Sequence, residues 1–156
     1  MTNQRLFVGT IVAVGLLAVA HATVTWPLAA TVAFFGGGAV LAFLAEAVAI
    51  SRGWLKHHIG PKHVGVPLYV LFGWTATVYI AFRVALLVTD GWMAVVAAGL
   101  LATSYDILVD HRGVEDGHWT YTDELPGPRY RGVPWWNFAG WLAISCSTAA
   151  FAVRFL

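Results

Sequence analysis

Long apolar runs alternate with short polar segments along the chain. Five runs reach or approach the roughly 20 residues that a helix needs to cross the hydrocarbon core of a bilayer. They cover residues 6–25, 27–50, 66–88, 92–109 and 133–156. The pattern predicts an all-α fold, namely a polytopic membrane helix bundle of about five transmembrane helices. We expect residues 1–156 to form a single membrane domain.

The first apolar run also has features of a secretory signal. Arg5 provides a short basic start, and Ala20-His21-Ala22 resembles a cleavage site. The run is long for a signal, however, and another apolar run follows it directly. We therefore favour a retained helix, and cleavage would leave the remaining topology unchanged.

The basic residues indicate how the helices are oriented. Seven of the nine Lys and Arg residues either precede the first run or lie in the loops 51–65 and 111–132. Short loops rich in Lys and Arg stay in the cytoplasm. The sequence therefore predicts a multi-pass protein of the cell membrane whose N-terminus and two long loops are cytoplasmic.

Composition supports the membrane prediction and narrows the function. Hydrophobic residues make up 59% of the 156 positions, against roughly 45–50% in soluble domains. The net charge of +1 gives no indication of nucleic-acid binding. Cys146 is the only cysteine, so a CxxC site is absent. Because His57, His58 and His63 lie in a basic loop without metal-ligand spacing, we expect surface histidines and no metal site.

A motif recurs in the two long loops, 67 residues apart. The matched loop residues are Gly60, Pro61, Lys62, Gly65 and Pro67 in the first copy, and Gly127, Pro128, Arg129, Gly132 and Pro134 in the second. Glycine permits tight turns and proline suits the first turn of a helix, so we expect structural roles for these positions. The pattern predicts an internal parallel helix–loop–helix repeat with units at about residues 42–88 and 95–156.

Three acidic residues lie within the apolar runs or at their ends, where a charge is costly and indicates function. At about 1.5 Å per residue, Glu46 lies about 7 Å from the cytoplasmic end of the second run. Asp106 precedes Asp110 by four residues, so these two share a helix face. Because the second and fourth runs have the same direction, we expect Glu46 and Asp106 at a similar depth and Asp110 nearer the water.

These three carboxylates are the candidate catalytic residues. A carboxylic acid in a dry pocket can hold a proton near neutral pH and act as a general acid toward an apolar substrate. The alternative is that they pair with Lys62, Arg129 or Arg131 and tie the loops to the helices. This alternative has most weight for Asp110, at the boundary, and we favour a functional role for the other two.

Aromatic residues gather near the same ends of the runs. Trp119, Tyr121 and Trp135 are typical of the membrane interface, but they could equally line a pocket for a long apolar ligand. Trp74 and Trp141 occupy equivalent positions of the repeat, and backbone geometry does not require a tryptophan there. All five are candidate substrate-binding residues.

Several ordered segments between about residues 43 and 141 match a known family. They are Leu44-Ala45-Glu46, Gly60-Pro61, Gly65-Val66-Pro67, Tyr105-Asp106-Ile107-Leu108-Val109-Asp110, Gly127-Pro128, Gly132-Val133-Pro134 and Asn137-Phe138-Ala139-Gly140-Trp141. The chain thereby resembles the integral membrane carotenoid-biosynthesis proteins typified by bisanhydrobacterioruberin hydratase and the γ-carotene hydratases. The resemblance implies that water is added across the terminal double bond of a linear carotenoid to give a tertiary alcohol. It also makes Asn137 a candidate substrate-binding residue.

The residues suit that chemistry. Protonation of the alkene requires an acid and generates a tertiary carbocation, which aromatic faces can stabilise. Asp106 or Glu46 would be the acid, and the other would stabilise the cation or accept the proton from the attacking water. Water is the only co-substrate, so we expect no cofactor. The expected partners are a linear carotenoid or another long isoprenoid and the surrounding membrane lipid.

Two other functions remain open. A lycopene-type cyclase uses the same protonation but closes a ring. The heterodimeric cyclases usually have a Pro-x-Glu motif, and none of the six prolines here is followed two residues later by Glu. The second alternative is a non-catalytic pigment- or lipid-binding membrane subunit, in which the buried acids only brace the bundle.

Overall fold

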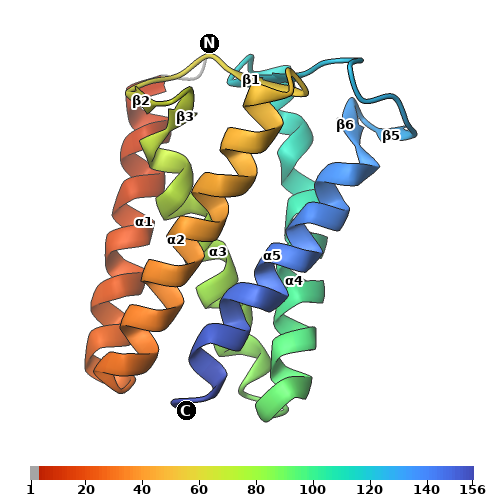
Figure 1. Ribbon diagram of the computed structural model, residues 1–156. Helices are drawn as coiled ribbons and strands as arrows, with labels where there is room; N and C mark the ends of the chain where they lie inside the picture. Colours follow the sequence, from red (N-terminus) through yellow and green to blue (C-terminus); the bar gives the residue numbers. More distant parts are fainter. Residues whose placement is uncertain (1–3) are drawn as a thin grey trace.

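A computed structural model describes residues 4–156 and shows a bundle of long helices (Figure 1). The helices are α1 (Gln4–Thr25), α2 (Leu28–Ser51), α3 (Leu68–Ala85), α4 (Gly91–Glu115) and α5 (Trp135–Val153). All five are long and apolar enough to cross a membrane. The predicted polytopic helix bundle is therefore confirmed, although α4 continues to Glu115, beyond its expected end at residue 109.

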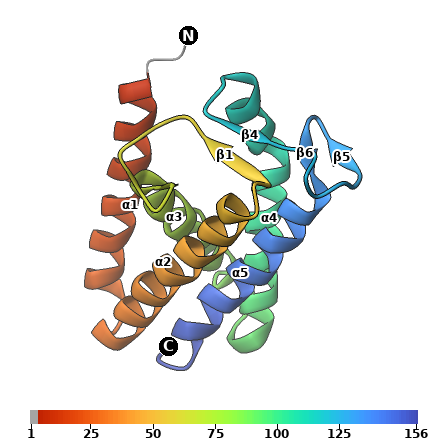
Figure 2. The same cartoon turned by 45° about the horizontal axis from the view of Figure 1, so that its top comes forward.

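The two long loops lie together at one end of the bundle, and they form short antiparallel strands that the apolar pattern did not predict. The strands are β1 (Leu55–His57), β2 (Lys62–His63), β3 (Val66–Pro67), β4 (Trp119–Tyr121), β5 (Arg129–Tyr130) and β6 (Val133–Pro134). β2 pairs with β3, β5 pairs with β6, and β1 pairs with β4 across the end of the bundle (Figure 2). We call residues 52–67 and 116–134 the hairpin end.

The two copies of the loop motif fold in the same way. Each β-hairpin has a two-residue turn with positive φ at both positions, as a type I′ turn requires. These residues are Val64 (50°) and Gly65 (82°) in the first copy, and Arg131 (51°) and Gly132 (87°) in the second. Pro67 and Pro134 have extended backbone and lie directly before α3 and α5, rather than in their first turns as expected.

The contacts between the two repeat units follow a two-fold pattern. α3 and α5 keep the spacing of 67 residues, whereas α2 and α4 end 64 residues apart, at Ser51 and Glu115. With that spacing of 64, Lys56 and Thr120 are equivalent, and they pair with each other between β1 and β4. A two-fold axis between the strands would place equivalent residues opposite each other, as Lys56 and Thr120 are. In agreement, α2 packs on α5 and α3 packs on α4, while α1 packs mainly on α3 outside the repeat.

Small residues let the helices approach closely, as is usual within membranes. A Cβ atom added to Gly38 of α2 would lie 2.6 Å from Cγ2 of Thr148 on α5. A Cβ atom added to Gly99 of α4 would clash with Sγ of Cys146 on α5. Glycines thus allow α5 to pack against both α2 and α4.

Candidate active site

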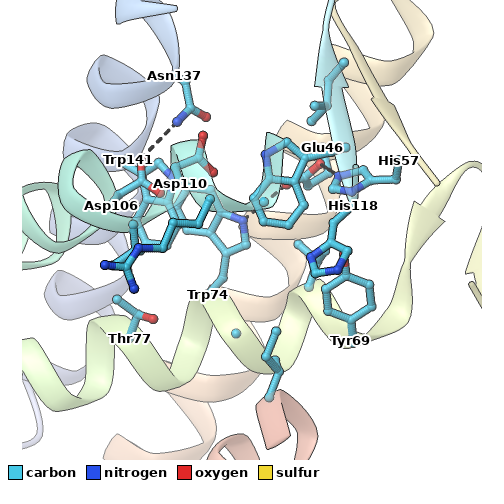
Figure 3. Close-up of a pocket in the computed structure, with 18 of the residues that line it drawn as sticks. Glu46, His57, Tyr69, Trp74, Thr77, Asp106, Asp110, His118, Asn137 and Trp141 are labelled. Atoms are coloured by element: carbon cyan, nitrogen blue, oxygen red, sulfur yellow. Dashed lines mark hydrogen bonds and ion pairs between the residues drawn. The ribbon is translucent and has the colours of Figure 1, made fainter. Parts of the chain in front are cut away.

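A cavity of about 410 Å³ lies below the hairpin end, between helices of both repeat units. All three predicted acids, Glu46, Asp106 and Asp110, line it (Figure 3). The other predicted site residues in its wall are Trp74, Trp119, Tyr121, Asn137 and Trp141. Trp135 does not line the cavity, and its side chain is 60% exposed.

Glu46 is held by two side chains that reach it from different elements. His57 Nε2 lies 2.9 Å from Glu46 Oε2, and Trp74 Nε1 donates to Glu46 Oε1 at 3.3 Å. The pairing of β1 with β4 folds His57 back over the end of α2, so His57 is buried. The expected surface position was therefore wrong for His57, although His58 and His63 are exposed.

Asp110 is the repeat equivalent of Glu46. Each lies five residues before the end of its helix, and each is bonded to a residue 11 positions later. For Asp110 this residue is Tyr121, whose hydroxyl donates to Oδ2 at 2.9 Å. Asp106 lies one helical turn deeper, about 6 Å along α4. The expectation that Asp106 shares the depth of Glu46 was therefore wrong, because α4 is longer than its apolar run indicates.

An acid at the position of Asp106 occurs only in the second repeat unit. Asp106 is 3% exposed and accepts a hydrogen bond from Asn137 Nδ2 at 2.9 Å. The equivalent residues in the first unit are Ala42 and Val70, which are buried in an apolar cluster beside Trp74. The pair of Asp106 and Asn137 is therefore a polar feature of the second unit that the first unit lacks.

The basic residues of the loops form contacts of their own. Arg129 pairs with Asp123 at 2.9 Å, and Arg131 pairs with Glu115 at 3.3 Å. Lys62 donates to the backbone oxygen of β1. The alternative in which these cations neutralise the buried acids was therefore wrong, since all three are engaged at the surface or with backbone.

Trp74 and Trp141 form an aromatic wall of the cavity. They occupy equivalent positions of α3 and α5, and their rings stack with centroids 3.6 Å apart and planes 12° from parallel. The ring faces of tryptophan attract cations. A positive charge that develops in the cavity would therefore be stabilised by this stack as well as by the carboxylates.

Several polar residues of the cavity were missed in the sequence. They include His57, Tyr69, Thr77 and His118. The hydroxyl of Tyr69 and Nδ1 of His118 are buried without a hydrogen-bond partner in the described part of the chain. The spacing of 11 residues between each acid and its strand residue includes His57, but it identifies His57 only once β1 and β4 are known to pair.

The family model described as carotenoid biosynthesis protein matches residues 6–156, which is nearly the whole chain. The chain belongs to this family. A role in carotenoid biosynthesis follows, and it is consistent with an enzyme that acts on a carotenoid or related isoprenoid. Among curated proteins and solved structures, none matches the chain. Within residues 4–156 of this family member, no cluster of three His, Cys, Asp or Glu side chains is placed to hold a metal ion.

Replacing Tyr121 with Phe is expected to lower the activity of this carotenoid biosynthesis protein about tenfold or more. Burial, together with nearby carboxylates such as Asp110, raises the pKa of Tyr121 well above its ordinary value, so the phenol stays protonated and donates to Asp110. A hydrogen bond to a charged group contributes about 1.5–3 kcal/mol. Tyr130, which is exposed on β5, provides the control. Equal product yields from Tyr121→Phe and Tyr130→Phe would contradict the role of this bond.

His118 is expected to make the protein less stable in acid. Burial lowers the pKa of this imidazole, with the carboxylate of Asp116 partly opposing the shift. Its ring lies 4.1 Å from that of Phe7. In the unfolded chain the pKa returns to about 6.5, so the unfolded state binds the proton first as pH falls. The free energy of unfolding therefore keeps its full value above pH 6.5, roughly the pKa of the unfolded chain, and decreases as pH falls below it.

The difference in thermal midpoint between pH 7 and pH 5 measures this effect. We expect a smaller acid-induced decrease in His118→Gln than in the unmodified protein, because the titrating group is gone. His63 is an exposed histidine of β2 and serves as the control. If the midpoint of His63→Gln falls between pH 7 and pH 5 by as little as that of His118→Gln, burial of His118 does not cause the sensitivity to acid.

Proposed function

We propose that this protein is a carotenoid hydratase, which adds water across the terminal double bond of a linear carotenoid to give a tertiary alcohol. The proposal is carried by one observation. Three buried carboxylates and a stacked tryptophan pair line a single cavity at the end of an apolar bundle. This combination can supply a proton to an alkene, stabilise the resulting cation and take a proton from water.

In the proposed reaction, the carboxyl group of Asp106 donates its proton to the CH carbon of an isopropylidene end group. The π electrons of the double bond form the new C–H bond, the C–C single bond remains, and a tertiary cation forms on the carbon that bears the two methyl groups. The oxygen of a water molecule attacks that carbon, and Glu46 accepts the proton that water releases. Return of this proton from Glu46 to Asp106 restores the enzyme, so the net change is the addition of one water.

The contacts of the two carboxylates support this assignment. Asp106 is bonded through Oδ2 to a neutral amide, which leaves Oδ1 able to carry the proton. Trp74 Nε1 donates a hydrogen bond to one oxygen of Glu46, and the other oxygen lies beside Nε2 of His57, which can donate or accept a proton. His57 is therefore placed to share the proton that Glu46 takes from water.

The position of the cavity suits a reaction between water and a lipid-soluble substrate. Two exposed residues also line the cavity, namely Arg112 in the last turn of α4 and Asp116 of the hairpin end, so water can enter from that end. The hydrocarbon part of the substrate would stay within the bundle or the bilayer. We assign the hairpin end to the cytoplasm, because its loops hold most of the Lys and Arg residues.

The test is the mass of the product. Purified protein in detergent is given a linear carotenoid with an isopropylidene end, in ordinary water and in water labelled with heavy oxygen. We expect a product heavier by one water that contains the label. A carotenoid whose ends are already cyclised is the control and should remain unchanged.

Other results would contradict the hydratase and identify the alternatives. A new product of unchanged mass would indicate a cyclase, because ring closure adds no atoms. If folded protein binds several acyclic carotenoids and converts none of them, it is a binding subunit.

A further inference from the structure

A second cavity of about 390 Å³ lies directly beside the first, between α1, α3 and α4. Four residues line both cavities, namely Ile11, Gly73, Thr77 and Tyr105. Thr77 is seen on α3 at the edge of the first cavity in Figure 3. The shared residues show that the second cavity continues the first, away from the hairpin end.

The second cavity is an apolar groove. Apart from the hydroxyl groups of Thr10, Thr77 and Tyr105, its lining is hydrocarbon, and no charged side chain contributes to it. It follows α3 from Gly73 to Val84, which is about 16 Å at the rise of an α-helix. The carboxylates of the first cavity thus lie at one end of this apolar groove.

The groove is open to the side. α1 packs on α3 and α4 packs on α3, so α3 forms the floor between the two other helices. The rim residues Val14, Ile80, Val84 and Leu101 are partly exposed, and in a bilayer they would contact lipid. A long hydrocarbon could therefore enter from the membrane without passing through the hairpin end.

The two repeat units differ at the position of this groove. By the spacing of 67 residues, Phe151 on α5 is equivalent to Val84 on α3. By the spacing of 64, Gly37 on α2 is equivalent to Leu101 on α4. Phe151 packs so closely on α2 that a Cβ atom added to Gly37 would lie 2.6 Å from its ring. The ring of Phe151 therefore occupies the equivalent position in the other half.

We propose that the groove binds the polyene chain of the linear carotenoid while the end group lies among the carboxylates of the first cavity. This inference rests on the proposed function and assigns the substrate two subsites. The first cavity selects the chemical nature of the end group, and the groove selects for a long acyclic polyene behind it. The apolar lining, the lateral opening and the continuity with the first cavity carry the proposal.

The experiment closes the groove at positions that do not touch the carboxylates. Val84→Phe introduces the residue type that fills the equivalent position of the other half, and Ile80→Trp adds bulk at the rim. Ser147 on α5 is equivalent to Ile80 and is exposed, so Ser147→Trp is the matched control. Each protein is tested with a linear carotenoid and with a short acyclic isoprenoid that has the same isopropylidene end.

We expect kcat/KM for the linear carotenoid to fall about tenfold or more in Val84→Phe and Ile80→Trp, as when a hydrocarbon pocket is filled. Activity with the short isoprenoid should stay within about twofold of the unmodified protein, and Ser147→Trp should match it with both substrates. Unchanged activity with the linear carotenoid would overturn the groove as its binding site. An equal loss with both substrates would also overturn it, because the substitutions would then act on the reaction rather than on chain binding.

A binding measurement separates this inference from the proposed reaction. The amount of linear carotenoid that co-purifies with each variant is read from its absorbance, together with the amount of phospholipid. If the unmodified protein converts no carotenoid but retains it, and Val84→Phe loses it, the groove is supported and the hydratase is not. If Val84→Phe keeps the carotenoid and loses phospholipid instead, the groove binds acyl chains and the inference is wrong.

Discussion

Asp106→Asn is expected to reduce hydration about 10²–10⁴-fold, the usual contribution of a general acid. The amide has the size of the carboxyl group and can still accept the hydrogen bond from Asn137, so the cavity keeps its shape. It has no acidic proton to donate to the alkene. The measurement is the yield of the product heavier by one water, at equal amounts of folded protein.

Asp123→Asn is the matched control for this experiment. Asp123 is exposed at the hairpin end and pairs with Arg129, away from the cavity. The same chemical change there should leave the product yield unaltered. If Asp106→Asn remains within about threefold of the unmodified protein, far from the loss expected for a general acid, Asp106 is not the acid.

Gly38→Val is expected to destabilise the bundle by about 1–3 kcal/mol, the usual cost of overpacking a core. A Cβ atom at this position would lie 2.6 Å from Thr148 Cγ2 and 3.4 Å from Thr75 Cγ2, so α2 would have to move away from α5. Displacement of α2 would also shift Glu46, two turns closer to the hairpin end. The measurement is the thermal midpoint in detergent, followed by helix content.

The neighbouring Gly36 provides a control in the same helix. A Cβ atom added there would meet nothing within 4 Å. Gly36→Val makes the same change in backbone freedom and side-chain volume as Gly38→Val. Because the added side chain meets no neighbour, the midpoint should stay close to that of the unmodified protein. Equal losses in Gly36→Val and Gly38→Val would show that helix propensity, and not contact with Thr148, limits stability.

The repeat explains why the fold was easier to predict than the site. Each apolar run signals a helix by length alone, and the recurring Gly and Pro positions mark the two equivalent hairpins. The depth of Asp106 could not be predicted in this way. The polar residues Asp110, His111 and Arg112 ended the apolar run, although the helix continues through them to Glu115. Hydropathy detects where a chain enters water, whereas helices end where their hydrogen bonding does.

His57 shows the same difference for the site. In the sequence it is one of three histidines in a basic loop, and nothing local distinguishes it from His58 or His63. Only the pairing of β1 with β4, which joins residues about 64 positions apart, turns it toward Glu46. The spacing of 11 residues that it shares with Asp110 and Tyr121 becomes informative once that strand pair is known.

The sequence by itself determined that this protein is a membrane helix bundle with an internal repeat and acids near one end of its helices. These properties depend on local apolar length and on residue spacing, which a chain displays before it folds. The tertiary structure alone decided that Asp106 and Asn137 meet within a shared cavity, and where an apolar groove continues from it. Both depend on how closely helices approach across the bundle, and that is set by the small residues and side-chain volumes of two distant segments together.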